Sequence, residues 1–153
     1  MARVAQFGIA VGALGVILTF MGLFPGVTGL EPTTGIGIIQ IFTIITGLGL
    51  LLMGAAIYAK FTIYPFTRAN LAQQIAIRLA LTGYIFLALT GLADIFGFGS
   101  HPQTAISDIL LGPLQAAGML SGFTVASVGI LLYAILGDLS ANGDTNGEKI
   151  STE

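Results

Sequence analysis

The chain has 153 residues, of which 55% are hydrophobic and only 8% are charged, and its net charge is −2. A soluble domain carries roughly a quarter charged residues, so this composition predicts an all-α integral membrane protein, and the small net charge excludes a nucleic-acid partner. The chain contains no cysteine and a single histidine, His101, which excludes disulfides, thiolate metal sites, cysteine nucleophiles and a paired-histidine haem site.

Four apolar segments follow one another along the chain, and each exceeds the roughly 18–20 residues that cross a bilayer. They are residues 4–24, 35–59, 75–98 and 106–136. The first is too long for the core of a signal peptide and no A-x-A-like site follows it, so we expect a retained transmembrane helix. The fourth is longer than a bilayer needs and contains Pro113, so we expect its start to lie flat at the interface or to kink at the proline.

The sequence predicts a four-helix transmembrane domain over residues 1–136 and a polar, acidic, disordered tail over 137–153. All five basic residues fall on one side of a four-span arrangement, which predicts that both termini are cytoplasmic and that the membrane is the bacterial cytoplasmic membrane. The expected interface anchors on this side are Tyr58, Tyr133, Lys60, Arg68 and Arg78.

One sparse pattern, Q-x6-G-x6-G-x3-Y-A, occurs over residues 40–59 and again over 115–134, 75 positions later. Because both copies fall in helices of the same direction, the pattern predicts two tandem helical hairpins related by a pseudo-two-fold axis along the membrane normal. The preceding loops match only with a shift of 70, which requires a five-residue insertion near Gly112 and Pro113. The first and third spans match in no single register.

Several glycines recur at a spacing of seven residues, which marks a straight seam along a left-handed helix pair. The predicted seam glycines at this spacing are Gly8, Gly15, Gly22, Gly47, Gly54, Gly122 and Gly129, and Gly118 adds a small-xxx-small face with Gly122 and Ala126. Small residues allow the backbones of membrane helices to approach closely, so we expect tight helix packing here. Lining of a pore or contact with a ligand is the alternative role.

Gln40 and Gln115 occupy equivalent positions near the outer ends of their helices. An amide at this depth needs a hydrogen-bond partner, and the predicted symmetry would let the two side chains form an interhelical polar contact. The functional alternative is a polar constriction that selects a small solute.

No phosphate-binding loop, hydrolase elbow or HExxH motif occurs, and we expect neither enzyme activity nor a metal site. The arrangement resembles the duplicated proteolipids of rotary ATPases, but those rotors need a carboxylate in mid-membrane, and residues 40–59 and 115–134 contain no Asp or Glu. We therefore predict a structural or accessory subunit of a larger membrane complex, such as a respiratory or photosynthetic electron-transfer assembly. Its partners would be membrane lipids and other integral membrane subunits, with lipid, quinone or carotenoid held by apolar contact. The alternatives are a small homo-oligomeric channel or transporter, and a regulatory factor that acts through the acidic tail.

Overall fold

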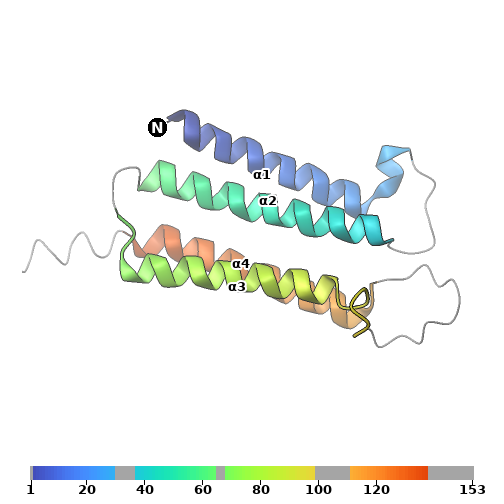
Figure 1. Cartoon of the computed structure of the whole chain (residues 1–153). Helices are drawn as coiled ribbons and strands as arrows, with labels where there is room; N and C mark the ends of the chain where they lie inside the picture. Colours follow the sequence, from blue (N-terminus) through green and yellow to red (C-terminus); the bar gives the residue numbers. More distant parts are fainter. Residues whose placement is uncertain (1, 30–36, 65–67, 99–110, 138–153) are drawn as a thin grey trace, which may run out of the picture.

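The structure, a computed structural model, describes residues 2–29, 37–64, 68–98 and 111–137. All regular secondary structure in this described part is helical, and it contains no strand. Its elements are α1 (Ala2–Leu23), the 3-10 helix η1 (Pro25–Thr28), α2 (Ile38–Ile63), α3 (Leu71–Gly91) and α4 (Pro113–Leu136) (Figure 1). All four α-helices are long and apolar enough to cross a membrane, as the helices of a multi-pass membrane protein are.

The bounds of the third helix differ from the prediction because a capping box sets its start. The Asn70 side chain accepts a hydrogen bond from the Gln73 amide at 2.7 Å, and the Gln73 side chain accepts one from the Asn70 amide at 3.2 Å. This reciprocal pair satisfies two backbone donors that the helix itself cannot, so α3 begins at Leu71 rather than at residue 75. It ends at Gly91, and the residues that follow, to Gly97, form turns rather than helix.

The fourth helix begins at Pro113 itself, so the described residues contain no helix that continues through the proline and kinks there. Proline is favoured at the first helical position, where its missing amide hydrogen is not needed. Residues 106–110, where the predicted span started, and 138–153, most of the predicted tail, lie outside the described residues.

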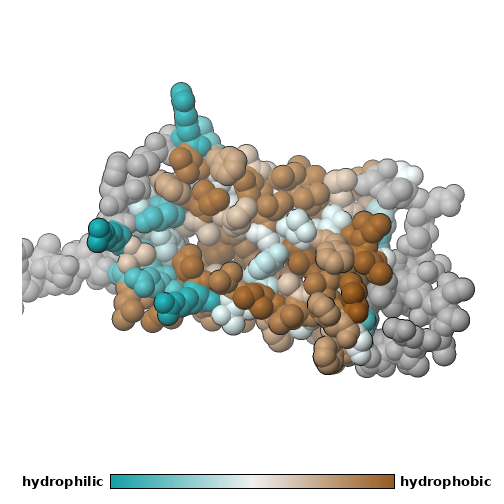
Figure 2. Space-filling model, in the orientation of Figure 1, coloured by the Kyte–Doolittle hydropathy of each residue, from teal (hydrophilic) through white to brown (hydrophobic). Residues whose placement is uncertain are grey.

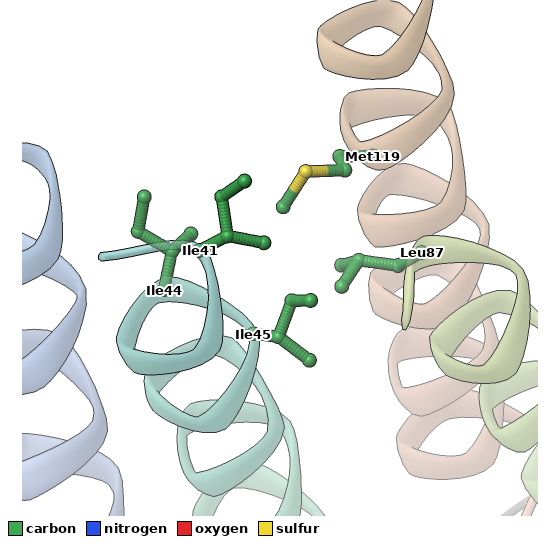
Figure 3. Packing of buried hydrophobic residues seen from close by; sticks show 5 residues of the cluster. All are labelled: Ile41, Ile44, Ile45, Leu87 and Met119. Carbon is green, nitrogen blue, oxygen red and sulfur yellow. The ribbon is translucent and has the colours of Figure 1, made fainter. Parts of the chain in front are cut away.

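The helices form two antiparallel pairs, in which α1 packs along α2 and α3 packs along α4 (Figure 1). The pairs meet mainly through α2, which contacts both α4 and α3. A buried apolar cluster fills this junction and comprises Ile41, Ile44, Ile45, Leu87 and Met119 (Figure 3). The helix α1 lies outside this junction, and most of its large apolar side chains are exposed.

Hydrophobic side chains cover most of the visible face of the molecule, and hydrophilic ones gather at the end where α1 starts and where α2 connects to α3 (Figure 2). Soluble monomers rarely expose contiguous apolar patches larger than a few hundred Å². The apolar faces of these helices therefore need lipid or other apolar partners.

Candidate functional site

The first hairpin is held by glycines that place the backbones of α1 and α2 in direct contact. A Cβ atom on Gly15 would lie 2.6 Å from the carbonyl oxygen of Gly47, and one on Gly8 would lie 3.0 Å from that of Gly54. At Gly22 the same atom would lie 3.1 Å from the backbone nitrogen of Ile44. These distances are shorter than ordinary van der Waals contact, so a side chain at these positions would push the helices apart.

The second hairpin is closed in the same way between α3 and α4. A Cβ atom on Gly122 would lie 2.7 Å from the backbone nitrogen of Leu87, and one on Gly129 would lie 2.5 Å from that of Ala80. Gly118 differs, because its nearest neighbours are atoms of the Thr90 side chain, the closest at 2.8 Å. The backbone seam of this hairpin therefore runs through Gly122 and Gly129, and Gly118 leaves room for a threonine.

The partner side of the second seam was missed in the sequence because it is built mainly from alanine. Gly83 lies against the backbone of Gly122 and Ala126, while Ala76 and Ala80 lie against Gly129. The available signal was the spacing of small residues at 76, 80 and 83, which is the three-and-four alternation of a helix seam. The α3 side of the seam contains no repeated glycine spacing and no polar residue that would mark it in the sequence.

The contacts give the two hairpins a common register. Corresponding contacts are Gly15–Gly47 and Gly8–Gly54 in the first hairpin, and Gly83–Gly122 and Ala76–Gly129 in the second. Between hairpins, the first helix is shifted by 68 positions and the second by 75, a difference of seven residues. The second hairpin therefore has seven more residues between its equivalent contact positions than the first. The five-residue insertion expected from the loops rests mostly on residues outside the described ranges.

Gln40 and Gln115 do not form the predicted contact with each other among the described hydrogen bonds. Each side-chain oxygen instead accepts from a backbone amide at the start of its own helix, from Gly37 at 2.6 Å and from Gly112 at 2.7 Å. Both residues stand at the third helical position, where a glutamine can reach back to an otherwise unpaired amide. Within the described residues, the side-chain nitrogen of Gln115 is buried and has no hydrogen-bond partner.

Tyr133 is buried rather than placed at the interface, which corrects its predicted role as an anchor. Only 3% of its surface is exposed, and its ring packs edge-on against Tyr64 with 6.1 Å between the ring centroids. The Tyr64 hydroxyl donates to the Ala134 carbonyl oxygen at 2.6 Å. Sequence reasoning treated Tyr133 like Tyr58, whose side chain is 43% exposed, because both end the same motif.

We call the contacts that join the α2–α3 connection to the end of α4 the polar clasp; its side chains are Tyr64, Asn70 and Gln73. Asn70 donates to the Leu136 carbonyl oxygen at 3.1 Å, and the buried Gln73 donates to that of Tyr133 at 3.4 Å. The last carbonyls of a helix have no partner within it. The clasp supplies these partners from outside α4. Asn70 and Gln73 join the start of α3 to α4 within the second hairpin, and Tyr64, at the end of α2, joins the two hairpins.

The predicted basic anchors lie at the same end as the polar clasp. Lys60 is half-buried in the last turn of α2, whereas Arg68 and Arg78 are exposed. Arg78 lies seven residues into α3, which is about 10 Å along the helix axis at 1.5 Å per residue. Its long side chain can therefore reach from an apolar depth toward the helix end.

An apolar groove opens on the side of α2 that faces α3, with a volume of about 480 Å³. Its lining residues are Thr46, Gly49, Leu50, Leu52, Met53, Ala56, Ile77, Ala80, Leu81, Tyr84 and Ile130. The ring of Tyr84 lies on Gly49, where a Cβ atom would be 2.5 Å from the hydroxyl oxygen, and this hydroxyl donates to the Ile45 carbonyl at 3.5 Å. We call the groove that these residues line the lateral groove. Its volume is within the range of small-molecule sites.

The chemistry available at these features is that of apolar contact and helix capping. Within the described ranges, no group of three or more His, Cys, Asp or Glu side chains is placed to hold a metal ion. No protein-family model matches the chain, and neither a curated protein nor a solved structure does. The function is therefore argued from the seams, the clasp and the lateral groove.

Proposed function

We propose that this chain is a structural or accessory subunit of a larger membrane complex, such as a respiratory or photosynthetic electron-transfer assembly. In this role it stabilises neighbouring helices and the lipid or pigment between them. The observation that carries the proposal is the apolar outer surface, above all that of α1, which packs along α2 and exposes most of its large side chains. A helix at the edge of the bundle, as α1 is, leaves the sides that do not pack on α2 open to neighbouring helices or lipid.

We further propose that the four helices span the bacterial cytoplasmic membrane with both termini in the cytoplasm. Support comes from the position of Arg3, Lys60, Arg68 and Arg78, which lie at or near the helix ends that share one end of the molecule. Positively charged residues are enriched on the cytoplasmic side of membrane proteins. The proposed orientation places the polar clasp at the cytoplasmic surface.

The two hairpins are proposed to be related by a pseudo-two-fold axis along the membrane normal. The common register supports this, since Gly47 and Gly122 make equivalent backbone contacts, with Gly15 and Gly83 respectively. The glutamine caps at Gln40 and Gln115 support it as well, because both bind the amide three residues earlier. Parallel repeats with this symmetry are known among membrane proteins.

A channel or transporter is less well supported. Its proposed constriction needs the amides of Gln40 and Gln115 to face a common path, and the oxygen of each accepts from the start of its own helix. Its pore would also need space along the glycines, and at Gly15, Gly47 and Gly122 that space is filled by the backbone of the paired helix. These contacts favour packing over conduction.

The test is to purify the tagged chain from native membranes in mild detergent and to analyse it by native electrophoresis and mass spectrometry. We expect a particle of several different integral membrane subunits, with this chain at fixed stoichiometry. A variant with Phe7→Ala and Ile17→Ala, which trims exposed side chains of α1, should weaken this association without unfolding the hairpins. A homogeneous particle that contains this chain alone would contradict the proposal and favour the channel.

A further inference from the structure

The lateral groove ends beside two basic residues. On α2, Lys60 follows the lining residues Ala56 and Met53 by four and seven positions, so the three side chains share one stripe of the helix. On α3, Arg78 follows the lining residue Ile77 directly and precedes Leu81 by three positions. The groove is therefore apolar along its length and positively charged at one end.

The length of the groove corresponds to one leaflet of a bilayer. Its lining residues on α2 extend from Ala56 to Thr46, ten residue-to-residue steps that span about 15 Å at 1.5 Å per residue. The hydrocarbon core of a bilayer is about 30 Å thick, so one leaflet contributes about 15 Å. Because Lys60 lies one turn nearer than Ala56 to the end of α2, its charge lies at headgroup depth, and the long Arg78 side chain can reach toward the same level. Thr46 then lies near the bilayer centre.

We propose that the lateral groove binds one acyl chain of an anionic phospholipid, with its phosphate between Lys60 and Arg78. The inference rests on the proposed membrane insertion and orientation, and it does not depend on the proposed complex. The acyl chain contacts the backbone at Gly49 and the side chains of Met53, Ala56 and Ala80. The ring of Tyr84 closes the deep end, where it packs on Gly49.

Charge and size favour an anionic phospholipid over a quinone, a carotenoid or a partner helix as the occupant of the groove. An uncharged quinone or carotenoid gains no Coulomb attraction from Lys60 and Arg78, whereas basic residues near the cytoplasmic surface attract anionic lipid. A helix is about 10 Å across, so a 15 Å length of partner helix occupies roughly 1,200 Å³. This is more than twice the groove volume of about 480 Å³. A partner helix of this length therefore exceeds the volume of the groove, which suits a single extended acyl chain.

The experiment compares phosphatidylglycerol with phosphatidylcholine of identical acyl chains, added to the delipidated, purified chain and measured by native mass spectrometry. Wild type should bind phosphatidylglycerol more tightly. Each of Lys60→Gln and Arg78→Gln should weaken this binding roughly fivefold, and the double variant roughly 25-fold, which would bring it near phosphatidylcholine. Arg3→Gln, which removes a charge at the same end but on α1, should leave binding unchanged.

The matched pair for the apolar part is Ala56→Phe and Ala55→Phe. Ala56 lines the groove, and its neighbour Ala55 is exposed on another face of α2. Filling the groove with phenylalanine at 56 should abolish binding of both lipids, whereas phenylalanine at 55 should not. Circular dichroism shows whether either phenylalanine variant fails to fold. If one does, the charge variants alone test the lipid proposal.

Equal binding of the two lipids by wild type would overturn the proposal, as would equal binding by the double charge variant and the Arg3→Gln control. If phosphatidylglycerol still bound to isolated Ala56→Phe, and the same variant released a partner subunit in the native-membrane preparation, the groove would belong to a helix and the lipid proposal would fail. Because the lipid-binding measurements use the isolated chain, their failure leaves the accessory role untouched. Loss of the native complex would likewise leave the lipid result standing.

Discussion

Gly15→Ala is expected to open the first hairpin, whereas Gly12→Ala, about one turn away in the same helix, is expected to leave it closed. The new methyl group at 15 would lie 2.6 Å from the Gly47 carbonyl oxygen, and at 12 it would lie 3.9 Å from the Gly54 Cα atom. Overpacking of this kind costs about 1–3 kcal/mol, while alanine stabilises a helix by up to about 1 kcal/mol relative to glycine. The two variants should therefore shift stability in opposite directions.

The measurement is the fraction of helix lost during titration with sodium dodecyl sulfate, starting from mild detergent micelles. Gly47→Leu and Gly122→Leu extend the test to both hairpins, since each adds a larger group against backbone atoms. Gly26→Leu is the control, because a Cβ atom at Gly26 has no neighbour within 4 Å. Equal unfolding midpoints for the alanine variants at 12 and 15 would show that the seams do not hold the hairpins.

Leu87→Ala is expected to weaken the junction between the two hairpins. Leu87 is 0% exposed and lies in the cluster formed with Ile41, Ile45 and Met119 (Figure 3). In soluble cores such a truncation costs about 2–5 kcal/mol, part of it for the cavity that remains. Lipid is as apolar as leucine, so in a membrane the transfer part is small and the cavity part dominates. We expect a loss of about 1–3 kcal/mol.

The matched control is Leu89→Ala, on the same helix with a side chain that is 56% exposed. Its truncation leaves no cavity and should shift stability by less than about 0.5 kcal/mol. Similar midpoints for the two variants would remove Leu87 from its proposed role at the junction.

The four helices were predictable because a membrane-spanning helix requires only a long apolar run, and the sequence contains four such runs. Their ends were not, because local capping sets them: Asn70 and Gln73 start α3 earlier than hydropathy does, and Pro113 starts α4 later. Hydropathy measures where a helix can lie in lipid, whereas a capping box acts through hydrogen bonds between neighbouring residues.

The seam was predicted where glycines repeat every seven residues, and it was missed on α3, where Gly83 stands among alanines such as Ala76 and Ala80. The spacing of these small residues stands out little in an apolar helix. The buried position of Tyr133 could not be foreseen, because it depends on packing against Tyr64, which lies at the end of α2. The lateral groove depends in the same way on the angle between α2 and α3. Features made by the packing of helices distant in sequence leave no periodic trace within either helix.

The most direct test of the account is the side of the membrane on which each connection lies, since the accessory role and the lipid site both presuppose it. The chain has no cysteine, so Val27→Cys, Arg68→Cys and Phe98→Cys each introduce a single thiol at an exposed position. An impermeant maleimide added to intact cells should label residues 27 and 98, and should label residue 68 only after the cells are permeabilised. Labelling of residue 68 in intact cells, or of all three only after lysis, would contradict the account.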